Sequence, residues 1–162
     1  MKILHVISSL DRKDGGLPEI AKNLVIQQNK KGRFSHILTT HSQSAKQQNK
    51  SMLKITKVFS FNRNFPQEIY YSDDLKKFID KNILNYDLIH IHGLYRFPTT
   101  YAAYKASKVG VPYICSPHGS LDPYLYKQSK KNLFLKRIWE LLFEFPLLKK
   151  SSAIHSTCEI EK

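Results

Sequence analysis

The sequence has little of what marks secreted or membrane-spanning proteins. It contains only two cysteines in 162 residues, Cys115 and Cys158, so no disulfide framework is expected and a reduced cytosolic setting is the default. No apolar run approaches the roughly 18 residues of a membrane-spanning helix. The apolar run at 3–7 contains a histidine and is followed by charged residues without a cleavage site, so it does not resemble a secretory signal.

Acidic residues are also scarce, with 13 Asp and Glu against 26 Lys and Arg and a net charge of +13. A field of this sign attracts nucleic acid, anionic lipid or phosphorylated substrates. Lysine greatly outnumbers arginine, and the chain has no Arg-rich reading helix or RNP-type aromatic motif, so we expect no nucleic-acid partner. Solubility alone explains the charge equally well, and both interpretations stay open.

Apolar runs alternate with amphipathic stretches along the chain, which predicts one doubly wound α/β domain over 1–162 with a Rossmann-like, mostly parallel sheet. The expected strands lie at 3–8, 34–40, 52–61, 87–92, 111–116 and 152–157. The expected helices lie at 18–31, 67–83, 99–108 and 126–150.

The stretch 113–124 carries the strongest functional candidate. Pro117 has no amide hydrogen and ends the strand, so His118 follows directly at its carboxyl end. The crevice of an open α/β sheet lies at that edge, which favours a functional role for His118 over that of a turn histidine. Asp122 would orient His118 or bind a hydroxyl, although Asp122-Pro123 is equally a plain turn signal.

The first strand-to-helix loop holds Gly15 and Gly16, which would let a phosphate or sugar approach the backbone near a helix N-terminus. The alternative is a tight loop without a ligand, because both the G-x-G-x-x-G pattern and the P-loop lysine pattern are absent.

His90 and His92 share one face of a predicted strand. A metal pair is conceivable, but no third ligand lies nearby in sequence, so we expect structural histidines or a crevice-lining His92. Tyr95 and Arg96 follow in the loop, where they would contact an anionic or sugar ligand or simply lie in solvent.

The segment 127–150 interleaves lysines and one arginine with leucines and aromatic residues. Such a helix lies at an anionic membrane surface or forms a crossover packed on the sheet, and the pattern fits both. Pro146 predicts a kink.

With these motifs in place, the chain resembles the N-terminal domain of family-four glycosyltransferases of the GT-B fold. Four stretches carry the resemblance in the family's order and span nearly the whole chain: Met1-Lys-Ile-Leu-His-Val-Ile-Ser with Asp14-Gly-Gly-Leu-Pro-Glu; Tyr86-Asp-Leu-Ile-His-Ile-His-Gly-Leu-Tyr; Pro112-Tyr-Ile-Cys-Ser-Pro-His-Gly-Ser-Leu-Asp-Pro; and Ala153-Ile-His-Ser-Thr-Cys-Glu.

The resemblance implies the acceptor-side half of a GT-B enzyme that transfers a sugar from a nucleotide-sugar to a polysaccharide or lipid-linked acceptor. His118 would contact the donor sugar, and Gly15 and Gly16 would lie against its phosphates. Asp14, His92, Tyr95, Arg96 and Asp122 would line the acceptor side. The nucleotide-sugar is a substrate, and no cofactor or metal is required. The implied location is cytoplasmic, peripheral at the inner face of the membrane.

The chain departs from the family pattern at its end. No E-x₇-E motif follows, so the donor-binding half is expected to be missing from this chain. We therefore expect a truncated domain that is incomplete alone or pairs with a separate donor-binding half. The alternative is an inactive remnant that acts at most as a membrane- or partner-binding domain.

Overall fold

The computed structural model shows one six-stranded parallel sheet with the order β3-β2-β1-β4-β5-β6. It describes residues 1–11, 15–42, 56–121 and 133–157. The strands are β1 Lys2–Ser9, β2 Phe34–His41, β3 Val58–Asn62, β4 Leu88–His92, β5 Tyr113–Ser116 and β6 Ala153–Ile154. The predicted Rossmann-like sheet is confirmed, and the order reverses between β1 and β4.

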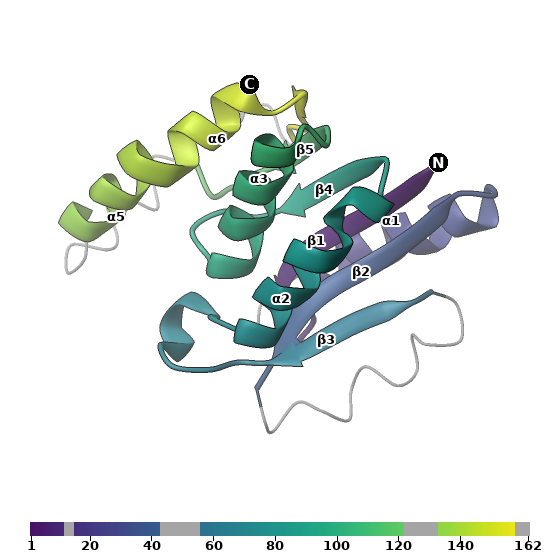
Figure 1. Cartoon of the computed structure of the whole chain (residues 1–162), viewed down its shortest axis with the longest axis horizontal. Coiled ribbons are helices and arrows are strands. Elements are labelled where there is room, and N and C mark those ends of the chain that lie inside the picture. Colours follow the sequence, from purple (N-terminus) through teal and green to yellow (C-terminus); the bar gives the residue numbers. More distant parts are fainter. Residues whose placement is uncertain (12–14, 43–55, 122–132, 158–162) are drawn as a thin grey trace.

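Strand β1 lies at the centre of the sheet, between β2 and β4, and is buried on both faces (Figure 1). Successive side chains of a strand point to opposite faces. Leu4 and Val6 therefore join the larger apolar core, whereas Ile7 joins a smaller one on the other face. His5 shares that second face, so a polar ring is buried where the alternation calls for an apolar residue.

Helices cover both faces of the sheet. They are α1 Leu17–Lys30, α2 Asp73–Asn82 and α3 Phe97–Val109, with short 3₁₀ turns η4 Gln67–Ile69 and η5 Ile83–Asn85. The larger core joins α2 and α3 to one face, while Ala21 and Val25 of α1 pack on the other. Ile20 of the same helix faces away from this core and is 50% exposed.

Several predicted elements differ in extent. The last strand, expected over 152–157, is only β6 Ala153–Ile154. The single helix expected over 67–83 is divided, because Ser72 is extended and its hydroxyl accepts the Leu75 amide, which starts α2 at Asp73. The described part of the third strand begins at Val58, and this strand lies at one edge of the sheet.

The described part of the basic-apolar segment is a helix with a wide turn in its middle. It comprises α5 Leu133–Trp139, the π-helix η7 Glu140–Glu144 and α6 Phe145–Lys150. The kink predicted at Pro146 is replaced by this turn, in which the Phe145 amide reaches back to Glu140. Proline cannot supply the next amide, and a π-turn accommodates that loss without breaking the helix.

Helix α6 packs against the rest of the domain. Leu147 and Leu148 are buried in the larger core, and the Tyr113 hydroxyl donates to the Leu147 carbonyl oxygen. This contact matches the crossover-helix interpretation. None of the helices in the described ranges is long and apolar enough to cross a membrane.

Ile79→Ala is expected to lower the free energy of unfolding by about 3 kcal/mol, because loss of this fully buried side chain would leave a cavity between α2 and the sheet. Urea unfolding monitored by circular dichroism measures the change. Lys81→Ala, on the exposed side of the same helix, is the control and should change stability by less than about 0.5 kcal/mol. Equal losses in the two variants would contradict the assigned core.

Candidate active site

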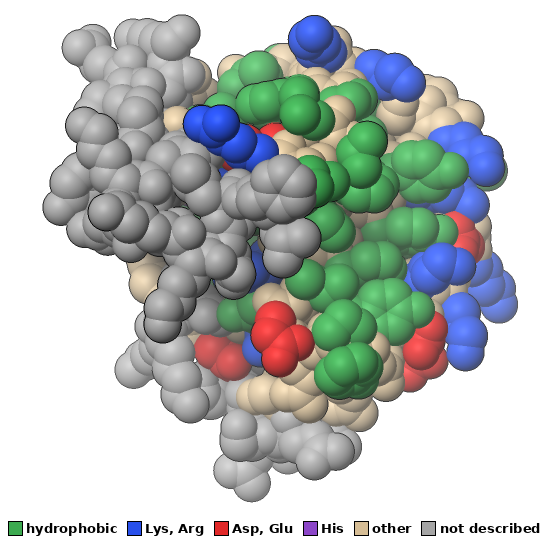
Figure 2. Space-filling model, turned by 90° about the vertical axis from the view of Figure 1, so that its left-hand side faces the viewer, with side chains coloured by type: hydrophobic (Ala, Val, Ile, Leu, Met, Phe, Trp, Pro, Cys, Tyr) green, Lys and Arg blue, Asp and Glu red, His purple; other side chains and the backbone are tan. Residues whose placement is uncertain are grey.

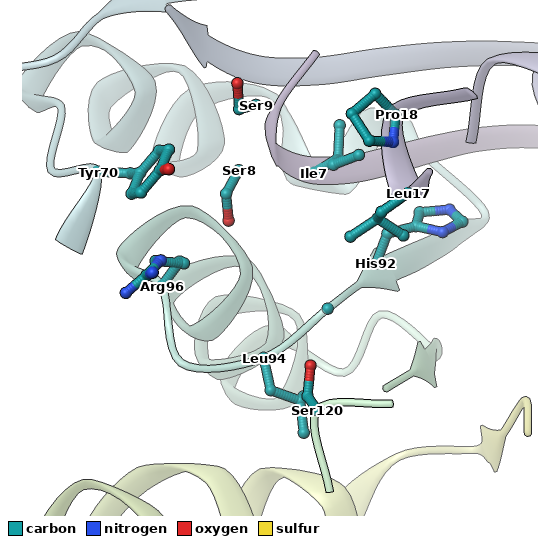
Figure 3. A pocket seen from close by; sticks show the side chains of 11 residues that line it. Ile7, Ser8, Ser9, Leu17, Pro18, Tyr70, His92, Leu94, Arg96 and Ser120 are labelled. Atoms are coloured by element: carbon teal, nitrogen blue, oxygen red, sulfur yellow. The ribbon is translucent and has the colours of Figure 1, made fainter. Parts of the chain in front are cut away.

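A pocket opens at the carboxyl ends of β1 and β4, where the strand order reverses (Figure 3). Its volume is about 220 Å³. The lining residues come from five separate segments of the chain: Ile7, Ser8, Ser9, Leu17, Pro18, Tyr70, His92, Gly93, Leu94, Arg96 and Ser120. Such a switch point is where open α/β sheets bind ligands. Of the predicted site residues, His92 and Arg96 line this pocket.

Gly93 begins the β4–α3 loop and lies close to the start of α1. Its φ is +77°, and its amide donates to the Ser116 carbonyl oxygen at 2.9 Å. A Cβ at this position would lie 3.3 Å from Cδ2 of Leu17. Glycine therefore lets the loop close against α1 in a left-handed conformation that other residues rarely adopt.

His118 lies beside His92, as expected from the carboxyl-edge argument. The two rings stack with centroids 5.4 Å apart, and Nδ1 of His92 is 3.2 Å from Nε2 of His118. The His118 backbone has φ +50°, a left-handed conformation that is uncommon for a residue with a side chain. Two predicted site residues that are 26 positions apart are thus in direct contact.

His92 also belongs to a buried group of imidazoles, which it forms together with His5 and His90. His5 and His90 are register partners across β1 and β4, and His90 and His92 stack with centroids 4.2 Å apart. Burial lowers the pKa of His5 to about 4, although its bond to Gln28 opposes the shift. Burial, followed by the neighbouring imidazoles, lowers the pKa of His90 to about 3 and that of His92 well below its usual value. All three rings are therefore neutral near pH 7.

The same three residues offer ligand atoms that all lie within 4.8 Å of one another. The sequence showed no third ligand near His90 and His92, whereas strand pairing brings His5 beside them. Nδ1 of His5 and Nε2 of His92 are hydrogen bonded at 2.9 Å, so a metal ion would have to displace the proton between them. Our expectation that the site needs no metal stays a prediction.

Two guanidinium groups lie near the ring of the pocket-lining Tyr70, and of these two only that of Arg96 also lines the pocket. The Arg63 guanidinium carbon lies 3.7 Å from the centre of the Tyr70 ring, and that of Arg96 lies 5.1 Å from it. Arg63 also donates through Nε to the Thr40 hydroxyl at 3.0 Å. Arg96 precedes the first turn of α3, where the exposed amides of the helix N-terminus add positive potential.

Tyr95 turns its hydroxyl to the C-terminal helix. The hydroxyl donates to Glu140 at 2.7 Å, and the Tyr95 amide donates to Glu144 at 3.1 Å. The same Glu144 oxygen accepts bonds from the Thr100 hydroxyl and the Trp139 indole. These buried carboxylates fasten the pocket loop to η7, so the described contacts of Tyr95 are structural.

A family model described as Glycosyltransferase Family 4 matches residues 14–162. The chain belongs to this family. A comparison with the sequences of curated proteins finds no significant match.

Solved structures resemble this family-four domain in fold. A Listeria monocytogenes protein described as a UDP-N-acetylglucosamine 2-epimerase has a TM-score of 0.60 at 12% identity, and the alignment covers 98% of this chain and 39% of that one. The Neisseria meningitidis UDP-GlcNAc 2-epimerase bound to UDP-GlcNAc has a TM-score of 0.52 at 19% identity, covering 88% and 39%. Anabaena HepE in complex with UDP and glucose has a TM-score of 0.52 at 16% identity, covering 96% and 43%. The chain spans less than half the length of these proteins.

Other predicted residues of the family-four domain lie outside the pocket lining. Gly15 and Gly16 are exposed, and Leu17 and Pro18 occupy the pocket wall instead. Asp14 and Asp122 lie outside the described residues.

No functional signal in the sequence marks Tyr70, which lines the pocket, Arg63, which contacts Tyr70, or Gln28, which contacts His5. Tyr70 and Gln28 lie only within the predicted helices 67–83 and 18–31. Nothing in a single sequence shows that such remote segments meet.

The buried imidazoles predict a stability that falls with acid. Unfolded His5 takes a proton near pH 6.5 and folded His5 only near 4, so the unfolded state binds more protons between these values and stability is lost as the pH falls through them. As the pH falls from neutral to roughly 5, the free energy of unfolding of wild type should drop by about 2 kcal/mol more than that of His5→Gln. Urea titrations of both chains at several pH values measure the difference between their free energies of unfolding. Because both chains contain the same carboxylates, the contribution of those groups cancels in this difference. Parallel pH profiles for the two chains would contradict a buried neutral His5.

Proposed function

We propose that this chain is the acceptor-side half of a glycosyltransferase that moves a sugar from a nucleotide-sugar to a polysaccharide or lipid-linked acceptor. The observation that carries the proposal is the pocket at the switch point of a family-four domain, with His118 and His92 in contact beside it. The named UDP-sugar ligands of the structural neighbours support a nucleotide-sugar as the donor.

The charge at the pocket supports an anionic ligand. Arg96 lies in its wall, and the N-termini of α1 and α3 both lie at this edge of the sheet. A diphosphate is an anion that helix N-termini and arginine bind well. In this proposal Gly15 and Gly16 admit the donor phosphates, and the Gly93 turn keeps the wall of the pocket close to them.

His118 is proposed to contact the donor sugar, because it lies at the carboxyl edge beside the pocket-lining His92. Asp14, Asp122 and Arg96 are proposed to bind the acceptor with His92, and the guanidinium of Arg96 is proposed to reach the donor diphosphate as well. Tyr95 is also proposed to line the acceptor side. Its hydrogen bonds to Glu140 and Glu144 are proposed to hold the neighbouring Arg96 in place.

A separate donor-binding half is proposed to complete the site, because transfer also needs groups that stabilise the leaving diphosphate. The helix α5–η7–α6 offers a surface for this half or for an anionic membrane at the cytoplasmic side. Leu141 and Leu142 are 67% and 63% exposed there, and Lys149 and Lys150 are exposed at the end of the same helix. Apolar side chains are spread over the adjoining face toward which the strands point (Figure 2). The alternative, an inactive remnant that binds a membrane or partner, uses the same surface.

Arg96→Ala is expected to weaken binding of UDP-glucose, or of the UDP- or GDP-sugar that binds best, by about tenfold or more, because a charge-assisted bond to the diphosphate would be lost. Amide NMR titrations measure the affinity, with and without a separately encoded chain that carries the E-x₇-E motif. Arg33→Ala removes the same charge from an exposed position at the opposite edge of the sheet and should leave binding unchanged. If no nucleotide-sugar shifts the resonances of Gly15, Gly16 and His118 under either condition, the transferase proposal is wrong.

A further inference from the structure

A continuous chain of hydrogen bonds runs from helix α1 to His118 through the interior of the domain. Nε2 of His5 lies 2.8 Å from Oε1 of Gln28, and Nδ1 of His5 lies 2.9 Å from Nε2 of His92. Nδ1 of His92 in turn lies 3.2 Å from Nε2 of His118. His5 is fully buried and His92 is 1% exposed, so the bond between them lies away from water, whereas the bonds to Gln28 and to His118 are partly buried.

The chain of hydrogen bonds has a direction, because it ends at Gln28 in an acceptor atom. Oε1 of Gln28 accepts from the Ser35 hydroxyl at 2.6 Å, so the His5 nitrogen that meets the same oxygen carries a hydrogen. A neutral imidazole has one N–H and one acceptor nitrogen. Nδ1 of His5 therefore accepts from Nε2–H of His92, and Nδ1 of His92 accepts from Nε2–H of His118.

Because the inner rings are neutral, each has only one N–H, and the order of donor and acceptor nitrogens along the chain of hydrogen bonds is therefore constrained. Burial lowers the pKa of both His5 and His92, so neither carries a second proton near neutral pH. Reversing the order would require every ring in the chain to exchange its tautomer and the Gln28 amide to turn over together. Leaving one buried nitrogen without its partner instead would cost the desolvation of that atom with no hydrogen bond in return.

The chain also ends in a group that cannot take a proton. A carboxamide oxygen accepts a hydrogen bond but is not a base near neutral pH, unlike the carboxylate that supports the histidine of a Ser-His-Asp triad. A proton taken up by His118 could move no further than a buried imidazole, where burial disfavours the charge. The chain therefore orients His118 and does not carry charge away from it.

We propose that Gln28, His5 and His92 are positioning residues that hold neutral His118 as its Nε2–H tautomer. Nδ1 is then the acceptor nitrogen of His118, and this atom is buried in the ligand-free chain. The tautomer follows from the contacts within this chain, and only a role of that nitrogen toward a sugar hydroxyl rests on the proposed function.

The direct test is the tautomer of each histidine in the ligand-free chain, read from long-range proton–nitrogen correlations of the imidazole rings at mildly alkaline pH. Wild type should show a pyrrole-type Nε2 and a pyridine-type Nδ1 for His5, His92 and His118. An Nδ1–H tautomer of His118 in wild type would overturn the proposal.

Three variants separate orientation from packing. Gln28→Leu removes the terminal acceptor and should give His118 a mixture of tautomers, whereas Gln28→Glu keeps an acceptor oxygen and should retain Nε2–H. Gln27→Leu, at the exposed neighbouring position, is the matched control and should resemble wild type. An unchanged His118 tautomer in Gln28→Leu would overturn the proposal, and the wild-type spectrum decides if that variant does not fold.

A zinc titration of wild type provides a further arm, because His5, His90 and His92 also have the spacing of a metal cluster. Unchanged imidazole resonances after one equivalent of Zn²⁺ would support the hydrogen-bonded chain. Stoichiometric binding that displaces the proton between His5 and His92 would overturn it. These spectra need no nucleotide-sugar, so loss of nucleotide-sugar binding with the expected tautomers would reject the proposed function and leave the positioning chain intact.

Discussion

The parallel pairing of β1 with β4 is the constraint on which the rest of the structure depends. It places Ile3 opposite Leu88 and Ile7 opposite His92, and it joins two strands that are more than 80 residues apart along the chain. The strand order reverses at this pair, so the loops after β1 and β4 turn to opposite faces and leave a pocket between them. A slip of one residue would turn His92 to the other face of the sheet and apolar side chains toward the pocket.

This pairing also explains why polar rings occupy the centre of the sheet. His5 and His92 could not be buried singly without leaving nitrogen atoms unpaired, but adjacent strands let each satisfy the other. The network then continues to Gln28 on one side and to His118 on the other. Buried polar networks of this kind specify one arrangement, because each member loses a partner when another moves.

A second polar contact joins the pocket to the C-terminal helix. Glu144 accepts bonds from the Tyr95 amide, the Thr100 hydroxyl and the Trp139 indole with one carboxylate oxygen. The π-turn that contains Glu140 and Glu144 follows from Pro146 and places both carboxylates toward the pocket loop. The helix therefore has a structural task in this domain, whatever binds its exposed leucines.

The sequence by itself determined the class of fold, the alternation of strands with helices, and the position of His118 at a carboxyl edge. Period-two and period-3.6 patterns, and a proline that ends a strand, act within a few residues and are visible locally. Only the tertiary structure decided that His5 is hydrogen bonded to His92, that Arg63 and Arg96 both lie near the Tyr70 ring, and that Tyr95 donates to Glu140. These contacts depend on strand register and helix packing between remote segments, and a local pattern carries no information about either.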